Sequence, residues 1–340
     1  MKNQQLTKLL LDWFAQNGRD LPWRYKGGAH PNPYIVFVSE MMLQQTTVKT
    51  VIPYFTRFIQ RFPTVQDLAS ATDDEVAKYW QGLGYYSRAR ALLHTAQTIC
   101  QIYDGHFPQI ESEVAKLKGF GPYMTASFLA LAFNQPQTVI DGNVMRIMCR
   151  MFGLTQPLDE IQPKIRQYAA TLASKTHPAD YASAIMDLGA TVCTPKKPLC
   201  VLCPWQKYCA SNGRADIEQI PARRSVSKKE YIGFVFIVYN ARGQVYIRKR
   251  SEKGLLHGLY EFPWNTATPD WLSDVSASEN YVTHVFTHIK MKLQIVYASA
   301  AKAPDDGFFV FSTQLTDYPM STLMQKVRRC IKTTKARSTE

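Results

Sequence analysis

The sequence lacks any apolar run approaching the ~20 residues that a helix needs to cross a bilayer. It also lacks a secretory signal, because Asp12 interrupts the apolar residues 9–11 and no small-residue cleavage site follows them. Residues 1–16 therefore predict an amphipathic helix. We expect an intracellular, cytoplasmic protein that has no membrane partner.

Acidic residues are scarce relative to basic ones. The 340-residue chain has 27 Asp and Glu against 40 Lys and Arg, which gives a formal net charge of +13 at pH 7. A basic surplus of this size favours polyanions such as nucleic acids, which are bound mainly through phosphate contacts. It also suits a basic soluble protein that binds no polyanion, so the charge alone leaves both interpretations open.

Cysteine is sparse over most of the chain. Of the seven cysteines, Cys100, Cys149 and Cys330 stand alone, as is typical of free thiols. The others crowd together with the spacing C-x6-C-x2-C-x5-C: Cys193, Cys200, Cys203 and Cys209. Without a secretory signal, such a cluster indicates a metal centre more than disulfides. Four thiolates on short loops suit an iron–sulfur cubane or a tetrahedral zinc, and the spacing leaves both open.

The hydrophobic pattern changes along the chain. The first part has helical periodicity, with Thr72 and Glu75 spaced as a capping box and Pro53 expected in the first turn of a helix. Later segments such as residues 232–239 and 245–248 are β-branched and aromatic runs that predict strands. We expect four parts: residues 1–212, a helical domain; 213–229, a linker; 230–332, an α+β domain; and 333–340, a disordered tail.

A candidate helix–hairpin–helix turn lies in residues 117–123. Gly119 and Gly121 allow the backbone to turn tightly, and Pro122 suits the first turn of a new helix. Backbone N–H groups at such a turn can point at an anion, which suits a DNA phosphate. A plain connection between two helices would have the same composition.

Two carboxylates stand in settings that suit catalysis. Glu40 lies between the apolar residues 35–38 and 41–43, where burial would raise its pKa and make it a proton donor near neutral pH, although most Glu side chains are solvated surface groups. Asp141 precedes an expected helix, as either an N-cap or an anion that faces a cationic transition state. A protonated carboxyl paired with an ionised one is the arrangement that cleaves glycosidic bonds.

Together these motifs resemble the helix–hairpin–helix DNA glycosylase superfamily, and specifically the adenine glycosylases of the MutY type. The resemblance covers nearly the whole chain and rests on the four clustered cysteines and six short segments: residues 21–24, 39–46, 82–88, 117–123, 141–144 and 186–190. It implies a multidomain protein, in which an all-α helix–hairpin–helix glycosylase domain with a cluster-binding loop precedes an α+β Nudix-like domain. It also implies that the four cysteines hold a [4Fe–4S] cluster rather than zinc.

The resemblance implies catalytic roles as well. Glu40 corresponds to the acid that protonates the adenine ring and then handles the attacking water. Asp141, with Asn143 beside it, corresponds to the carboxylate that stabilises the sugar cation. Tyr123 stands where lyase-competent relatives such as endonuclease III carry a Schiff-base lysine. Because a phenol cannot form an imine, cleavage should stop at the abasic site.

Further residues are implied to hold the DNA. The adenine pocket corresponds to Leu21, Trp23, Arg24, Leu43, Val48 and Ser183. DNA contacts correspond to Gln45, Thr46, Tyr85, Gly119 and Gly121. Among these, Gln45 and Tyr85 resemble residues that wedge into the duplex as the base flips out. Ser183 departs from the family, which commonly has Gln or Glu there, and the departure bears on the choice of base.

The strand-rich part is similar to the Nudix-like domain that is appended to these glycosylases. The similarity lies in residues 254–263 and 284–288, whereas the Glu-rich metal box of Nudix hydrolases is missing, so this domain should bind rather than hydrolyse. In the family, the loop that matches Phe286, Thr287 and His288 probes 8-oxoguanine opposite the target adenine. Taken alone, His288 would more often be an ordinary strand histidine.

The sequence therefore predicts a monofunctional, monomeric glycosylase of base excision repair that hydrolyses the N-glycosidic bond of adenine opposite 8-oxoguanine or guanine in double-stranded DNA. One alternative is a glycosylase for another mispaired or damaged base, thymine or an oxidised pyrimidine, against which Glu40 and the second domain argue. Another is a non-catalytic lesion-binding protein, which would lack Glu40 or Asp141.

Overall fold

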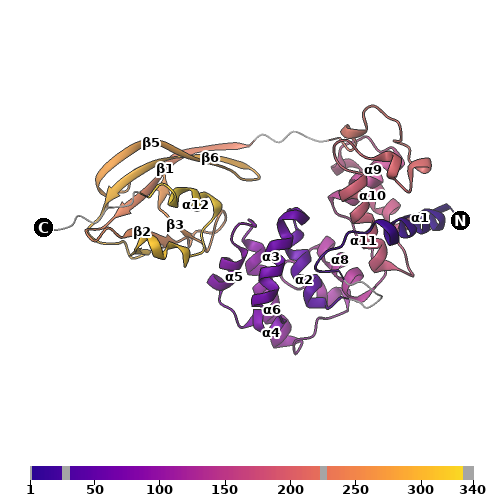
Figure 1. Cartoon of the computed structure of the whole chain (residues 1–340), viewed down its shortest axis with the longest axis horizontal. Helices are drawn as coiled ribbons and strands as arrows, with labels where there is room; N and C mark the ends of the chain where they lie inside the picture. Colours follow the sequence, from indigo (N-terminus) through magenta and orange to yellow (C-terminus); the bar gives the residue numbers. More distant parts are fainter. Residues whose placement is uncertain (1, 25–30, 223–227, 332–340) are drawn as a thin grey trace. The chain divides into compact units, whose positions relative to one another are not determined.

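The computed structural model describes the chain over residues 2–24, 31–222 and 228–331 (Figure 1). The predicted tail, residues 333–340, and the centre of the predicted linker, residues 223–227, lie outside the described residues. Within the described ranges, no helix is both long and apolar enough to cross a membrane.

Two compact units make up the chain. The helical unit comprises Met1–Ser70 and His94–Ser225, and the sheet unit comprises Ala71–Leu93 and Val226–Glu340. A short helical segment from the first half of the sequence thus belongs to the sheet unit. The domain boundaries expected after residues 212 and 229 stay predictions.

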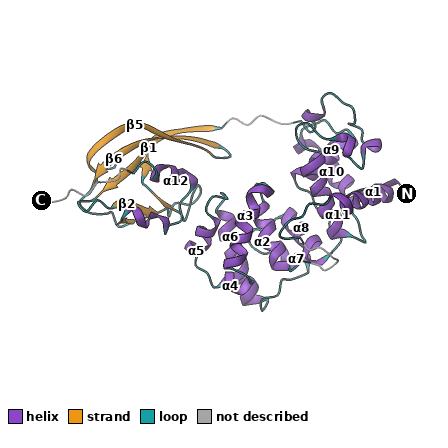
Figure 2. Cartoon of the chain, in the orientation of Figure 1, coloured by secondary structure: helices purple, strands orange, loops and turns teal. Residues whose placement is uncertain are grey.

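The first part of the chain is helical, as its periodicity predicts (Figure 2). The helices are α1 Lys2–Asn17, α2 Pro33–Leu43, α3 Val48–Arg61, α4 Val65–Ala69, α5 Asp73–Trp80, α6 Ser87–Ile102, α7 Glu111–Val114, α8 Pro122–Phe133, α9 Gly142–Phe152, α10 Leu158–Leu172 and α11 Pro178–Asp187. Short turns follow: the π-helical η1 Leu188–Val192, and the 3-10 turns η2 Cys200–Leu202, η3 Gln206–Tyr208 and η4 Ile217–Gln219. α5 and the start of α6 belong to the sheet unit.

Helices α2 and α8 are apolar around most of their circumference and pack against each other. α2 has the sequence PYIVFVSEMML, and most of its residues are buried. It begins at Pro33, where the Asn32 side chain accepts a hydrogen bond of 2.9 Å from the Tyr34 N–H. α8 begins at Pro122, directly after the predicted hairpin. A polar side chain on either helix is therefore enclosed by neighbouring elements.

Pro53 does not lie where the sequence predicted it. α3 begins at Val48, so Pro53 stands in the interior of the helix instead of in its first turn. Val51, Phe55 and Phe58 are buried at helical spacing. Because Val51 precedes Pro53 and packs on the same buried face, the helix begins before the proline. Packing here outweighs the backbone hydrogen bond that Pro53 cannot donate.

The sheet unit is α+β, as predicted. Its strands are β1 Lys229–Tyr239, β2 Val245–Lys249, β3 Tyr260–Glu261, β4 Trp264–Asn265, β5 Ser273–Val285, β6 Ile289–Ser299 and β7 Gly307–Val310. The sheet order is β3-β2-β1-β6-β5, with β7 paired to β2 and β4 paired to β1. β1 and β6 run parallel, and the other pairs are antiparallel.

Alternation along β1 divides its side chains between two faces of the sheet. Val235 and Ile237 belong to a buried cluster that includes Leu323 of α12 (Thr322–Arg328). Phe236 and Val238 belong to a second cluster, which lies on the other face. The β-branched and aromatic run that predicted this strand therefore supplies side chains to a buried cluster on each face of the sheet.

Candidate active site and metal-binding loop

One cavity of about 650 Å³ in the helical unit gathers the predicted catalytic and pocket residues. Its lining includes Leu21, Trp23, Arg24, Glu40, Leu43, Val48, Tyr123, Asp141, Asn143 and Ser183. They come from the loop after α1, from α2, α3, α8, α9 and α11, and from the residue before α9. Segments more than a hundred residues apart in sequence thus face a common space. The predicted DNA contact Thr46 also borders this cavity.

Glu40 is buried on α2, with 3% of its surface exposed. Its Oε2 accepts a hydrogen bond of 2.6 Å from the Ser127 hydroxyl and one of 3.0 Å from the Tyr123 hydroxyl. The donors are four residues apart on α8 and so lie on the same helix face. Sequence reasoning missed Ser127, although its spacing from Tyr123 was a usable signal.

Burial raises the pKa of Glu40 above its ordinary value. The hydrogen bonds from Ser127 and Tyr123 act in the opposite direction, because they stabilise the carboxylate. The negative charge of Asp141 raises the pKa further, and the Arg24 guanidinium lowers it. The net shift is upward, as the apolar neighbours in the sequence predicted. Glu40 therefore keeps its proton to higher pH than a solvated glutamate.

Asp141 is the N-cap of α9 and also borders the cavity. Its Oδ1 accepts a hydrogen bond of 2.7 Å from the Val144 N–H, and its Oδ2 accepts one of 2.8 Å from the Asn143 amide. The N-cap interpretation is therefore confirmed, and the role of Asp141 as an anion that faces a cationic transition state stays a prediction. The N-terminal end of α9 also favours negative charge at this position.

Tyr123 remains a neutral phenol. Burial raises its pKa well above the ordinary value, and the carboxylates of Glu40 and Asp141 raise it further. Its hydroxyl donates to Glu40, and the residue lines the cavity. The position holds a hydrogen-bond donor and no amine nucleophile.

A buried ion cluster fixes the loop that carries Trp23 and Arg24. Asp187, at the end of α11, is 0% exposed. Arg24 donates two hydrogen bonds to its carboxylate, of 2.7 and 2.8 Å, and Arg19 donates from its backbone N–H and from Nε at 2.9 and 2.8 Å. Sequence reasoning did not single out Asp187 or Arg19. Asp187 lies in the segment 186–190 that carries the family resemblance, but no role was predicted for it.

Two arginines on α9 connect the cavity to the cysteine loop. Arg146 donates to the Asn143 side chain at 2.9 Å, and to the backbone oxygens of Gly189 and Cys193 at 2.7 and 2.8 Å. Arg150, one turn later and almost fully buried, donates to the backbone oxygens of residues 194, 195 and 220. Neither was predicted, although cations four residues apart in an apolar helix are unusual.

The four clustered cysteines are near enough for their thiols to act on one another electrostatically. Burial raises the pKa values of Cys200 and Cys209, and that of Cys203 to about 12; in each case the neighbouring thiols raise the pKa further. The Arg150 guanidinium donates to the Cys193 sulfur at 3.6 Å. Among the described residues, no three His, Cys, Asp or Glu side chains are close enough to hold a single metal ion. A loop with four neighbouring thiols and a buried cation fits a multi-iron cluster, whose charge is negative with thiolate ligands.

The predicted hairpin is a tight turn. Gly119 has a φ of +86°, which only glycine adopts without strain, and α8 begins three residues later at Pro122. Gly121 is the N-cap residue and is open to solvent, with nothing within 4 Å of a Cβ added to it. Gly121 and Pro122 are both exposed, so the N-terminal end of α8 reaches the surface, a position that suits an anion.

In the sheet unit, the predicted wedge residue Tyr85 contacts the predicted lesion-reading loop. Its hydroxyl lies 2.6 Å from the Thr287 hydroxyl, and both residues line a cavity of about 460 Å³ together with Phe286 and His288. Tyr85 has a φ of +48°, and Gln45, the other predicted wedge, has one of +55°. Non-glycine residues with such backbone angles concentrate at functional sites. The sequence did not predict the contact between Tyr85 and Thr287.

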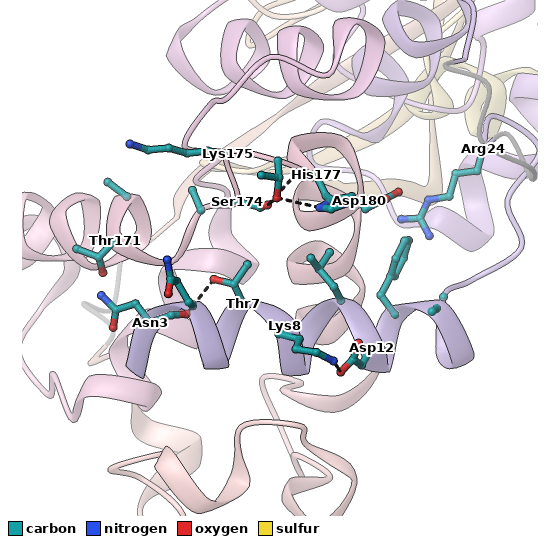
Figure 3. Close-up of a pocket in the computed structure, with 18 of the residues that line it drawn as sticks. Asn3, Thr7, Lys8, Asp12, Arg24, Thr171, Ser174, Lys175, His177 and Asp180 are labelled. Atoms are coloured by element: carbon teal, nitrogen blue, oxygen red, sulfur yellow. Dashed lines mark hydrogen bonds and ion pairs between the residues drawn. The ribbon is translucent and has the colours of Figure 1, made fainter. Parts of the chain in front are cut away.

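A larger cavity in the helical unit, of about 1220 Å³, was not predicted as a site (Figure 3). Figure 3 shows Thr7, Lys8 and Asp12 along α1, with His177 across the cavity and Arg24 at one end. Some of its polar groups already have partners: Thr7 donates to the backbone of residue 172 at 2.8 Å, and Lys8 pairs with Asp12 at 2.6 Å. Of the predicted site residues only Arg24 borders it, so it is not the predicted active site.

Three family models match the chain. Residues 38–170 match the HhH-GPD superfamily of base excision DNA repair proteins, residues 193–209 the iron-sulfur binding domain of endonuclease III, and residues 234–329 the NUDIX domain. The second of these covers the four clustered cysteines from first to last. It therefore decides in favour of an iron–sulfur cluster where the spacing of the cysteines left zinc open.

Curated relatives cover most of the chain. The adenine DNA glycosylase of Mus musculus is 34% identical over 94% of this chain and 76% of its own length. That of Homo sapiens is 32% identical over 94% of this chain and 72% of its own. That of Buchnera aphidicola subsp. Schizaphis graminum is 35% identical over 78% and 77%.

Solved structures match part of the chain. A thermostable thymine-DNA glycosylase aligns with a TM-score of 0.55 at 26% identity, over 62% of this chain and 96% of that chain. Endonuclease III in a non-covalent DNA complex aligns with a TM-score of 0.52 at 19% identity, over 62% and 97%. The second likeness is one of fold alone.

Proposed function

Because the chain belongs to the family of the adenine DNA glycosylases, we propose that it removes adenine opposite 8-oxoguanine or guanine from double-stranded DNA. It is an enzyme of base excision repair that acts on an N-glycosyl bond. The observation that carries the proposed mechanism is the shared cavity, in which buried Glu40 and helix-capping Asp141 face the same space. Duplex DNA as substrate goes with the net charge of +13.

Glu40 acts as the general acid in this mechanism. Its raised pKa lets the carboxyl keep its proton to higher pH than a solvated glutamate, so that it can give this proton to a ring nitrogen of adenine as the N-glycosidic bond breaks. The base leaves as neutral adenine, and the sugar becomes an oxocarbenium ion. Glu40 is then a carboxylate, which can take a proton from the attacking water.

Asp141 stabilises the sugar cation electrostatically. Hydrogen bonds from Val144 and Asn143 hold its two oxygens in place, so no reorganisation is needed as the positive charge develops. Tyr123 offers no amine for imine formation, so water is the nucleophile and the product is an abasic site. The reaction is therefore monofunctional.

The base pocket is proposed to combine apolar walls with a few polar groups. Leu21, Trp23, Leu43 and Val48 would flank the adenine ring, and Arg24 and Ser183 would contact its edge. Ser183 is short, so it leaves more space at this edge than the Gln or Glu that is common in the family.

The substrate proposal is tested by single-turnover excision on four duplexes at fixed salt: adenine opposite 8-oxoguanine, adenine opposite guanine, thymine opposite guanine, and an oxidised pyrimidine. We expect excision of adenine from the first two only. Faster release of thymine or of the oxidised pyrimidine would identify that base, and not adenine, as the substrate. Stoichiometric lesion binding without excision would identify the protein as a lesion-binding module.

The [4Fe–4S] cluster is assigned to Cys193, Cys200, Cys203 and Cys209. When bound, it supplies a cross-link that fixes the loop of residues 193–209. Arg150 and Arg146 then hold this loop against α9, the helix that begins at the catalytic Asp141. Basic residues of the loop are proposed to lie against the DNA backbone.

Anaerobically purified protein is expected to contain about four iron atoms and four sulfides per chain, with broad absorption in the visible. Cys203→Ala should lower the iron content, because it removes one ligand. Cys100→Ala is the matched control, since this thiol lies outside the cluster loop, and it should leave iron unchanged. Stoichiometric zinc without iron would overturn the assignment. Iron and sulfide are measured chemically on the same samples.

Phe286, Thr287 and His288 are proposed to read the base opposite the adenine. Replacing Phe286 and His288 together with alanine should weaken the preference for 8-oxoguanine over guanine by roughly tenfold or more, since each lost contact is worth about 1–3 kcal/mol of discrimination. The measurement is excision of adenine opposite each base, for parent and variant. Phe311→Ala, which removes an exposed aromatic side chain outside this loop, should leave the preference unchanged. Equal losses on both substrates would assign the loop to general DNA affinity.

The protein is proposed to act as a monomer on its DNA. Sedimentation equilibrium of the holoprotein, alone and with a mispaired duplex, tests this. We expect one chain per duplex, and two chains per duplex would contradict the proposal.

A further inference from the structure

The carboxyl of Glu40 is held asymmetrically. Ser127 and Tyr123 both donate to Oε2, at 2.6 and 3.0 Å, and no described residue donates to Oε1. Ser127 is 0% exposed and is absent from the lining of the cavity, whereas Glu40 lines it. Both donors to Oε2 come from α8, so Oε1 is the oxygen left without a donor among the described residues and available to a ligand in the cavity.

This asymmetry limits where the acidic proton can sit. A carboxyl oxygen has about two lone-pair positions for hydrogen bonding, and two donated hydrogen bonds occupy those of Oε2. A proton on Oε2 would compete with Ser127 or Tyr123 for the same lone pair and would leave a buried donor unsatisfied. The arrangement thus favours the proton on Oε1.

We propose that Ser127 is a positioning residue for the proton of Glu40: together with Tyr123 it occupies Oε2, so that the acid carries its proton on the oxygen that faces the substrate. The inference rests on the proposed role of Glu40 as general acid. As the proton moves from Oε1 to the ring nitrogen of the base, both donors remain on Oε2, and they stabilise the carboxylate that forms. No group has to rotate during this step.

The inference gives the sign of a pH effect. The charged and titratable groups that act on Glu40 are Tyr123 on α8, Asp141 at the start of α9 and Arg24 in the loop after α1, and Ser127 adds a neutral donor. Removal of that donor destabilises the carboxylate and so raises the pKa of Glu40 further. Excision requires protonated Glu40, so its rate falls on the alkaline side. Without the Ser127 hydroxyl, the alkaline limb of the pH–rate profile for excision should therefore move to higher pH.

The test compares Ser127→Ala with the parent holoenzyme in single-turnover excision of adenine between pH 5 and 10. We expect the alkaline limb to move up by about one pH unit, the loss of one hydrogen bond to a charged group. We also expect the plateau to fall by roughly threefold to tenfold, because the proton is no longer confined to Oε1. Tyr123→Phe, which removes the other donor on Oε2, should move the limb in the same direction.

Thr125→Val is the matched control. Thr125 is also buried on α8, and its hydroxyl has no hydrogen-bond partner among the described residues. The variant therefore removes a buried hydroxyl without touching Glu40, and its limb should stay where the parent has it. Ser127→Cys, which keeps the size with a weaker donor, gives a smaller shift and serves if the alanine variant does not fold.

Infrared titration of the Glu40 carboxyl separates this inference from the proposed function, because it needs no turnover. The signal is the protonated-carboxyl band of the parent minus that of Glu40→Gln. An upward displacement of its midpoint in Ser127→Ala supports the positioning role even if the parent does not excise adenine, in which case the proposed function alone fails. Unchanged infrared and kinetic midpoints in an active, folded Ser127→Ala variant would overturn the inference.

Discussion

Glu40→Gln is expected to lower the single-turnover rate of adenine excision by about 10²- to 10⁴-fold, the usual contribution of general acid catalysis. The amide keeps the size of the side chain and can accept the hydrogen bonds from Ser127 and Tyr123, but it has no acidic proton to give to the base. Affinity for the mispaired duplex, measured by equilibrium binding at fixed salt, should stay near that of the parent. Turnover close to that of the parent would make Glu40 a structural residue.

Two controls keep this result specific. Glu111→Gln removes an exposed carboxyl on α7 outside the cavity and should leave excision unchanged. The second control is stability. Because the folded-state pKa of Glu40 is raised, its contribution to stability is present at low pH and is lost as the pH rises through the folded pKa. Glu40→Gln has no proton to lose at this position. Its unfolding midpoint should therefore decline less than that of the parent as the pH rises.

Local signals in the sequence predicted the fold well. The Thr72 hydroxyl accepts a hydrogen bond of 3.2 Å from the Glu75 N–H, as the capping pattern required, and Asp141 caps α9. The burial of Glu40 followed from its apolar neighbours on both sides. Pro53 was misplaced, because a local preference of proline yielded to the burial of Val51. Each success rests on residues within one or two turns of one another.

The site beyond these signals depends on contacts that no local pattern contains. Ser127 lies 87 residues from Glu40 in sequence, and Arg19 lies 168 residues from Asp187. Their roles follow only from the packing of α8 against α2 and from the meeting of the α1 loop with α11. The resemblance to a family predicted the residues that line the pocket. It did not predict the roles of the residues that hydrogen-bond to them and fix their positions.

The ion cluster of Asp187 gives the second large effect. Asp187→Asn should lower the free energy of unfolding by about 3–5 kcal/mol, the usual result when one partner of a buried ion pair loses its charge. Arg19 and Arg24 would then lie largely buried without a counterion. The N–H groups of the new amide would face guanidinium groups, which donate hydrogen bonds and cannot accept them. Urea unfolding of the holoprotein at pH 7 measures the loss. Asp216→Asn, which breaks the exposed pair with Arg214, should leave the midpoint unchanged.

The pH dependence distinguishes a lost charge from a lost shape. Burial alone would raise the pKa of Asp187, but the hydrogen bonds and charges of Arg24, and then those of Arg19, outweigh it and lower the pKa below its ordinary value. A depressed folded-state pKa contributes stability above the unfolded pKa, and that contribution is lost as the pH falls through the folded value. The difference between parent and Asp187→Asn should therefore be full at neutral pH and shrink in acid. A difference that stays constant across this range would mean that the substitution disturbs packing, and that the charge of Asp187 does not hold the loop of Trp23 and Arg24.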